Sequence, residues 1–339
     1  ILGANLSENN FLGTGKQVGV GINKSTYQSS LNFSYTEPYY TIDGVSVGYS
    51  LYARETDYGD FNISSFSTNT YGASVNWSYP ISDIQRIGFG FGYENLDVST
   101  GTYDSKEITD FVTENGNLFD VFTFNANWVK STLNRGMFAT RGTSQRFGLA
   151  LALPGSGLEY YKLTYTGEYL RGLYGPLTLK LRADLGYGES YGDTTTMPFF
   201  KNFYGGGFGS VRGFKRNTLG PQDTPPCDEV RCFDDPDPIG GNVQIEFGAD
   251  IIFPLPFLKD QRSVQSSLFF DVGNIFNTKC GESQVSCFKP EVGELRYSAG
   301  IGATWLSGFG PITFSIAKPL NANDFDETEV FQFSLGNQF

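Results

Sequence analysis

The chain alternates apolar residues with polar or very small ones, at a period of two, over most of its length. In residues 71–79 the odd positions hold Tyr, Ala, Val, Trp and Tyr, whereas the even positions hold Gly, Ser, Asn and Ser. Residues 87–94 and 177–187 repeat this pattern. Because successive side chains of a β-strand point to opposite faces, each segment predicts a strand with one apolar face. No stretch has a convincing helical period, so the sequence predicts an all-β fold.

Fifteen such segments can be traced, and short turns alternate with longer connections between them. The long connections fall at about 99–118, 190–240 and 276–294. Short turns at one end and long loops at the other are typical of a bacterial outer-membrane barrel. The expected strands are residues 1–8, 16–24, 26–37, 44–56, 69–79, 86–98, 119–130, 143–153, 159–171, 177–189, 241–253, 263–275, 295–306, 312–319 and 329–339.

A soluble β-sandwich would show the same alternation, but two features favour a membrane barrel. Charged residues such as Lys180, Arg182 and Asp184 lie in the middle of a strand on its polar face, which suits a water-filled lumen. The apolar faces end repeatedly in Trp, Tyr or Phe, the residues enriched at membrane interfaces. No run approaches the roughly 18 apolar residues that a membrane-spanning helix needs. We therefore expect a transmembrane antiparallel β-barrel.

The number of strands implies that one more belongs to this barrel. Single-chain bacterial barrels have even strand numbers. Fifteen is odd, and the chain starts in mid-pattern at Ile1 without a turn. We therefore expect a barrel of sixteen strands whose first strand lies upstream. Residues 1–339 would form one barrel domain, with its longest loop at about 190–240.

The charge and the amino-acid usage exclude several classes of function. A net charge of -12 argues against binding to nucleic-acid backbones, which requires clustered Lys and Arg. The chain contains no His, so neither a Ser-His-Asp nor a Cys-His catalytic arrangement can form. We expect a protein that is not an enzyme and that needs no cofactor.

The four Cys residues form two local pairs, Cys227 with Cys232 and Cys280 with Cys287. Both pairs lie in polar, turn-rich segments, which predicts two small disulfide-closed loops in an oxidising compartment. A metal site is the alternative, but the chain lacks His and the pairs lack the tight spacing of zinc ligands. We therefore expect no metal.

The longest loop contains the segment FYGGGFGSVRGF at residues 203–214, in which Gly and aromatic residues surround one charge, Arg212. Gly-rich loops can bind phosphate when their backbone N–H groups converge on the anion. Such a loop would open a helix, and no helix is expected here. The segment therefore needs another explanation than phosphate binding.

The segment VRGF at 211–214, inside a long loop late in the barrel, resembles the hallmark motif of the BamA family. These barrels of the bacterial outer-membrane protein insertase belong to a superfamily of outer-membrane insertases and two-partner secretion transporters. The VRGF motif marks the superfamily, and further blocks favour the BamA family itself. The likeness covers nearly the whole chain and includes NFLGTG, EPYYTIDGVSVG, MPFFKNFYGGG, NTLGP, GGN, FFDVGN, SAGIGATW and FQFSLGNQF.

The resemblance assigns roles to individual residues. It implies that the loop at about 190–240 is a lid whose tip folds back into the lumen. Asp250 and Asp271 match acidic lumen positions near the Arg of the motif, and the period of two independently places both on lumen-facing sides. The residues that match the tip of the lid are Val211, Arg212, Gly213 and Phe214.

The last expected strand, residues 329–339, resembles the family's gate strand, which meets the first strand in a short, weak seam. Gly336 is the informative residue, because a Gly inside a strand weakens it and permits a kink. The apolar face of this strand holds Phe331, Phe333, Leu335 and Phe339.

The function implied is folding and insertion of β-barrel proteins into the bacterial outer membrane, through a lateral seam and strand addition, without nucleotide. The implied partners are the lipid bilayer, unfolded β-barrel clients and the accessory lipoproteins of the assembly complex. Family members carry periplasmic POTRA domains before the barrel, and none is expected in this sequence. The alternatives are a two-partner secretion transporter, which would pass an unfolded protein through the lumen, and a passive diffusion channel, which would need an open lumen.

Overall fold

The computed structural model describes residues 2–59, 63–101, 104–226, 235–255, 263–280, 284, 287–308 and 310–335. Within these residues fifteen strands form one antiparallel sheet, in which every strand pairs with its neighbours in the sequence. The strands are β1 (Leu2–Glu8), β2 (Gln17–Lys24), β3 (Gln28–Glu37), β4 (Ser46–Asp57), β5 (Phe66–Ser82), β6 (Gln85–Thr100), β7 (Leu118–Ser131), β8 (Gly142–Ala152), β9 (Tyr160–Gly172), β10 (Thr178–Ser190), β11 (Val243–Phe253), β12 (Val264–Phe276), β13 (Arg296–Ser307), β14 (Gly310–Pro319) and β15 (Phe331–Leu335).

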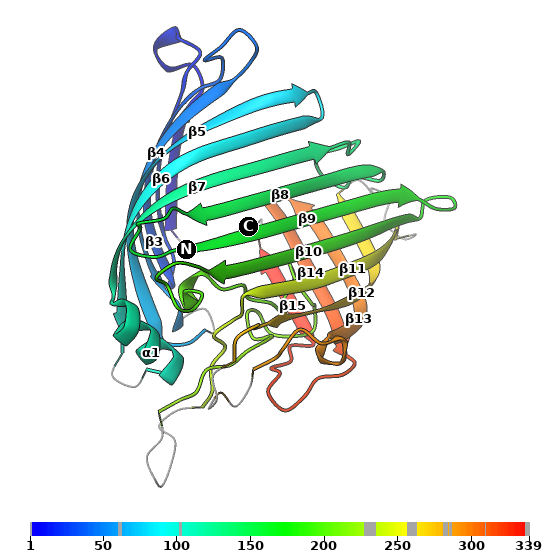
Figure 1. The fold of residues 1–339 in the computed structure, drawn as a ribbon. Coiled ribbons are helices and arrows are strands. Elements are labelled where there is room, and N and C mark those ends of the chain that lie inside the picture. The colour runs from blue at the N-terminus through cyan, green and yellow to red at the C-terminus, as the bar shows by residue number, and fades with distance from the viewer. Residues whose placement is uncertain are drawn as a thin grey trace.

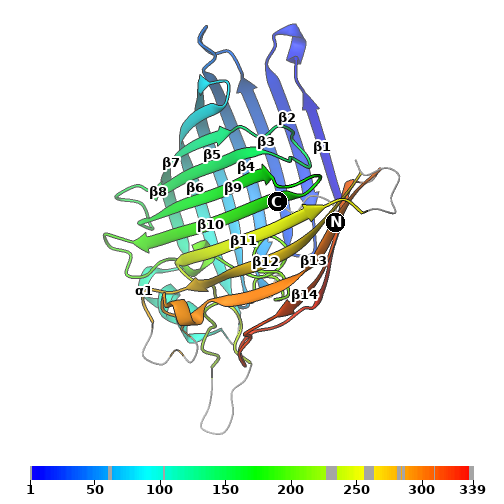
Figure 2. The same cartoon turned by 90° about the vertical axis from the view of Figure 1, so that its right-hand side faces the viewer.

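The all-β antiparallel fold is confirmed, and the number of strands in the described residues equals the expected number. Figures 1 and 2 show the strands curving into a tall wall around an interior. The sheet is not closed among the described residues, where β1 and β15 are its two edge strands.

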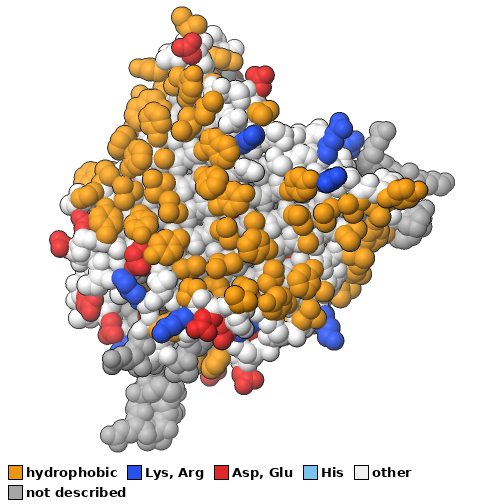
Figure 3. Space-filling view, turned by 45° about the vertical axis from the view of Figure 1, so that its right-hand side comes forward, with side chains coloured by type: hydrophobic (Ala, Val, Ile, Leu, Met, Phe, Trp, Pro, Cys, Tyr) orange, Lys and Arg blue, Asp and Glu red, His pale blue; other side chains and the backbone are white. Residues whose placement is uncertain are grey.

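The two faces of the wall follow the alternation in the sequence. Phe89 and Phe91 on β6 point outward and are 44% and 47% exposed. Gly90, between them, lies on the inner face opposite Asn76 of the neighbouring strand β5. A Cβ on Gly90 would lie 2.1 Å from Oδ1 of Asn76, so the Gly gives this Asn its space in the lumen. Hydrophobic side chains accordingly spread over the outside of the strands in Figure 3, as lipid contact requires.

The expectation that the chain has no helix is wrong at one place. Helix α1 (Lys106–Asn115) lies in the connection between β6 and β7 and ends at Gly116, whose φ is +86°. Its buried residues are Ile108 and Phe111, three positions apart and hence on the same side of the helix. Two apolar residues are too short a pattern to be recognised as a helical period. No helix in the described residues is long and apolar enough to cross a membrane.

An apolar core surrounds α1 at one end of the barrel, the lower end in Figure 1. Phe111 of α1 packs edge-on against Phe199 of the connection between β10 and β11, with ring centroids 5.4 Å apart. The ends of β6 and β7 contribute further buried side chains. This core fixes the root of the long loop before the loop turns inward. Its members include Leu96, Val98, Ile108, Phe111, Phe119, Val121, Leu158, Phe199, Phe200 and Ile239.

Candidate functional site: the docked lid loop

The lid loop, residues 191–242 between β10 and β11, is a folded unit within its described residues. Its two arms pair with each other. Phe203 and Gly241 exchange two backbone hydrogen bonds, of 2.8 and 3.1 Å, and the Leu219 N–H donates to the Gly205 carbonyl at 3.2 Å. The tip bends sharply at Gly206 and Gly207, which have φ values of +102° and +89°. Such angles favour Gly, which accounts for the glycine-rich segment without any phosphate.

Arg212 at the tip contacts both carboxylates that the resemblance assigns to it. Its Nε donates to Oδ2 of Asp271 at 2.6 Å and its Nη2 to Oδ1 at 2.8 Å, while Nη1 donates to Oδ1 of Asp250 at 3.0 Å. The backbone N–H of Arg212 adds a bond of 3.2 Å to Asp271. The guanidinium also lies 3.5 Å from the centroid of the Phe269 ring. The structure therefore brings Arg212, Asp250 and Asp271 together, with β11 and β12 supplying the carboxylates.

Burial makes these contacts strong. The Asp271 side chain is fully buried, and the Arg212 side chain is only 12% exposed. Burial disfavours the charged guanidinium, but its hydrogen bonds to Asp271 and the charges of both carboxylates outweigh burial and raise the pKa of Arg212. A buried charge of this kind is tolerated only with its partner present. The cluster therefore fixes the tip of the lid to one place on the wall.

Two further contacts of the lid were not assigned from the sequence. The Ser210 hydroxyl donates to the Glu246 carboxylate and accepts a bond of 2.6 Å from the Gly206 N–H. Arg182 donates to the Ser210 carbonyl, and its Nη2 lies 3.8 Å from Asp271. In the alternation Arg182 lies on the polar face of its strand, and Glu246 shares a face with Asp250. It gives no indication of which lid residue each would meet.

The apolar residues of the motif form a small core of their own. Val211, Phe214 and Leu219 pack together and are at most 1% exposed. Gly213 has a φ of +93°, and a Cβ there would lie 3.0 Å from the Cβ of Ala317 on β14. All four residues of the motif are thus held inside the barrel, by charge, by apolar packing or by close backbone approach.

The expected gate strand is described as far as Leu335. Phe331, Phe333 and Leu335 point outward and are 57%, 52% and 65% exposed. Gln332 and Ser334 face the lumen and are buried. Gly336 and Phe339 lie outside the described residues.

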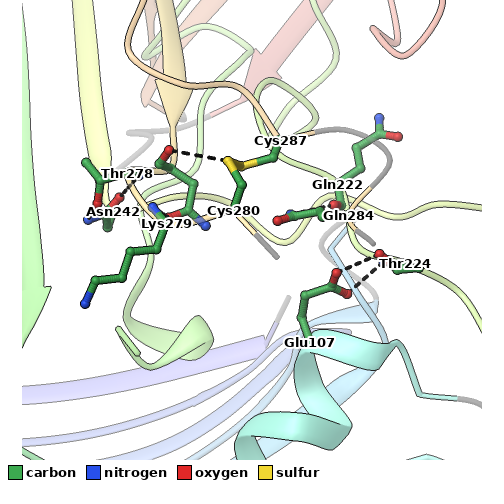
Figure 4. Close-up of a disulfide and its surroundings, with 10 residues drawn as sticks. Glu107, Gln222, Thr224, Asn242, Thr278, Lys279, Cys280, Gln284 and Cys287 are labelled. Carbon is green, nitrogen blue, oxygen red and sulfur yellow. Dashed lines mark hydrogen bonds between the residues drawn. A yellow bond between two sulfur atoms is a disulfide. The ribbon is translucent and has the colours of Figure 1, made fainter. Parts of the chain in front are cut away.

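The disulfide between Cys280 and Cys287 is confirmed, with a Cα–Cα distance of 5.8 Å. It closes part of the connection between β12 and β13, beside the lid (Figure 4). In the same region Gln284 donates to the Gln222 carbonyl of the lid at 3.0 Å. Cys227 and Cys232 lie outside the described residues.

Comparison with known proteins gives matches along almost the entire chain. Residues 10–339 match the family model of the Omp85 superfamily domain. The outer membrane protein assembly factor BamA of Neisseria meningitidis serogroup B is 34% identical over 368 residues, which cover all of this chain and 45% of that protein. The chain thus spans less than half the length of this relative.

Solved structures agree with these matches. BamA from Haemophilus ducreyi, in a form lacking POTRA domains 1–3, superposes with a TM-score of 0.90 at 30% identity, covering 98% of this chain and 66% of that one. CdiB from Escherichia coli superposes with a TM-score of 0.57 at 12% identity, over 98% of this chain and 58% of that one, a likeness of fold alone. This chain is therefore a BamA-like barrel that belongs to the Omp85 superfamily.

Proposed function

We propose that the protein containing this barrel folds and inserts β-barrel proteins into the bacterial outer membrane, without nucleotide, cofactor or covalent chemistry. The observation that carries the proposal is the likeness, over the whole chain, to a relative named as an outer membrane protein assembly factor. The protein would be integral to the outer membrane. Its partners would be the lipid bilayer, unfolded β-barrel clients and the accessory lipoproteins of the assembly complex.

The physical basis of the activity would be the edge of the sheet. A strand edge in lipid is costly, because its backbone N–H and C=O groups find no water. An unfolded client strand can satisfy such an edge by adding to it. β15 is the candidate edge, because it pairs with β14 through Phe331–Leu335 and is the last strand of the described sheet.

The docked lid argues against a passive channel, and the comparisons argue against a secretion transporter. A passive channel needs an open lumen, whereas here Arg212 and the core of Val211, Phe214 and Leu219 occupy the interior. A two-partner secretion transporter is less well supported, because the likeness to CdiB is confined to the fold. Insertion of clients therefore accounts for more of the observations.

Reconstitution tests the proposed function. The full-length protein is placed in liposomes with any accessory subunits that copurify, and an unfolded outer-membrane client is added. We expect the client to become protease-resistant faster than in empty liposomes, and Arg212→Ala to lose most of this acceleration. Arg135→Ala is the control, because Arg135 is an exposed residue of the turn between β7 and β8. A wild-type protein that does no better than empty liposomes contradicts the proposal, and steady ion conductance would then favour a channel.

A further inference from the structure

The chain immediately after Arg212 pairs with the segment that leads into β15. Phe214 and Thr328 form an antiparallel bridge. On one side of the bridge the Glu329 N–H donates to the Gly213 carbonyl at 2.8 Å, and on the other the Lys215 N–H donates to the Glu327 carbonyl at 2.9 Å. The tip of the lid therefore adds a short stretch of β-structure directly ahead of the edge strand.

Gln332 continues this contact inside β15. Its Nε2 donates to the Phe214 carbonyl at 2.8 Å, and its Oε1 accepts from the Gly213 N–H at 3.4 Å. The side chain is 3% exposed, so water cannot easily replace either bond. Undocking of the lid would break both of these hydrogen bonds at once.

Three consecutive residues of the lid, 212–214, contact two pairs of strands that lie on either side of β13. Arg212 binds the carboxylates of β11 and β12. One residue later, Gly213 rests against Ala317 of β14, where an added Cβ would be crowded. Phe214 then binds Gln332 of β15. Displacement of the tip by even one residue would break contacts on both sides at once.

We propose that Gln332 and residues 327–329 are a latch, through which the docked lid restrains β15 and releases it only when Arg212 undocks. Gln332 is a positioning residue in this scheme, because it acts through the lid and the edge strand. The role of the latch in client insertion rests on the proposed function. The coupling between lid and strand is a property of the fold and can be measured without any client.

Hydrogen exchange on the full-length protein in lipid nanodiscs tests the coupling. We expect Arg212→Ala and Gln332→Met each to speed exchange of the peptide covering Phe331–Leu335 by about tenfold, through more frequent local opening. The double variant should exchange no faster than the faster single variant, because the two residues act on one opening event. Ser334→Ala, on the same face of β15 but without a hydrogen bond to the described part of the lid, is the control and should match the wild type. If Arg212→Ala frees the lid while β15 exchanges at the wild-type rate, the latch is overturned.

A covalent lock gives an independent test that needs no buried substitution. Lys215 and Glu327 lie opposite each other, partly exposed, with Nζ and Oε2 2.7 Å apart. Cysteines at these positions should form a disulfide, since directly opposed residues of antiparallel chains have suitable Cα spacing. The oxidised Lys215→Cys/Glu327→Cys protein should show slower exchange of β15 and lose client insertion, and a reductant should restore both.

The Lys215→Ser/Glu327→Ser protein, given the same oxidant and reductant, controls for effects on the natural Cys280–Cys287 disulfide. If β15 of the locked barrel exchanges at the wild-type rate, the latch is wrong. The proposed function still stands in that case, provided that the wild-type protein inserts clients in the same assay. A wild-type protein without insertion activity would instead overturn the proposed function and leave the measured coupling standing.

Discussion

Arg212 and Asp271 lie 59 residues apart in the sequence and meet in a two-pronged hydrogen bond inside the barrel. The planar guanidinium presents Nε and Nη2 to the two oxygens of one carboxylate, the geometry in which Arg and carboxylate bind most strongly. The third nitrogen, Nη1, is left to reach Asp250 on the neighbouring strand. One side chain of the lid thereby contacts two adjacent strands of the wall.

Arg212→Ala should undock the tip of the lid. Removing one member of a buried ion pair leaves Asp271 without its main partner and costs about 3–5 kcal/mol of local stability. Arg212→Lys should restore only part of this, because a Lys ammonium cannot match both carboxylate oxygens at once. Limited proteolysis of the lid measures the effect, and equal resistance of Ala, Lys and wild-type proteins would contradict the docking role.

Asp271 should contribute more than Asp250 to the docking of the lid. Asp271 is fully buried and accepts two side-chain bonds and one backbone bond from Arg212. Asp250 accepts only one bond from Arg212. Asp271→Asn should therefore loosen the lid almost as much as Arg212→Ala, and Asp250→Asn markedly less. Hydrogen exchange of residues 211–214 in the two variants distinguishes them. The reverse order would show that the fork on Asp271 is not the principal contact.

Gly213→Ala should destabilise the docked lid, whereas Gly209→Ala should not. Gly213 has a φ of +93°, and a Cβ added there would lie 3.0 Å from the Cβ of Ala317. A Cβ added to Gly209 would meet no atom within 4 Å. Strain at positive φ costs on the order of 1–3 kcal/mol. Thermal unfolding and lid proteolysis of this matched pair test the prediction. Similar losses in both variants would point to a general effect of Gly replacement in the loop.

The contact between the lid loop and the connection between β4 and β5 should weaken as the pH rises towards 7. Burial raises the pKa of Asp223 to about 7, and the charges of Asp237 and Glu107 act in the same direction. This carboxyl accepts hydrogen bonds from the Ser64 hydroxyl and the Asp237 N–H, and so ties the lid to the connection between β4 and β5. Between about pH 4 and pH 7 the folded protein keeps the Asp223 carboxyl protonated, whereas the unfolded chain loses this proton with a pKa near 3.8. The stabilisation of the folded state by this proton is therefore complete below about pH 4 and declines as the pH rises to about 7.

Hydrogen exchange of the Asp223 and Thr224 amides, corrected for the intrinsic effect of pH, measures this dependence. We expect greater protection at pH 5 than at pH 8 in the wild type. Asp223→Asn cannot ionise and should remove most of the difference. A wild-type protein with equal protection at both values would contradict the assignment to Asp223.

The sequence by itself determined the barrel fold, and which side chains of each strand face the lumen and which face outward. A period of two is a local property, because each strand residue points opposite to its neighbour whatever the rest of the chain does. For that reason the alternation alone assigns Asp250, Asp271 and the outward Phe331 and Phe333 to their faces. The resemblance supplied what periodicity cannot, namely that Arg212 would meet these two carboxylates.

Only the tertiary structure decided which residues the lid touches elsewhere. Gln332 and Phe214 are separated by 118 residues, and their contact depends on how far the lid extends into the lumen. The pairing of Ser210 with Glu246 depends on the same path. Helix α1 is a further case, since Ile108 and Phe111 are buried in one core with Phe199 and Phe200, far along the chain. These features come from long-range packing of irregular chain, which has no period from which a partner could be predicted.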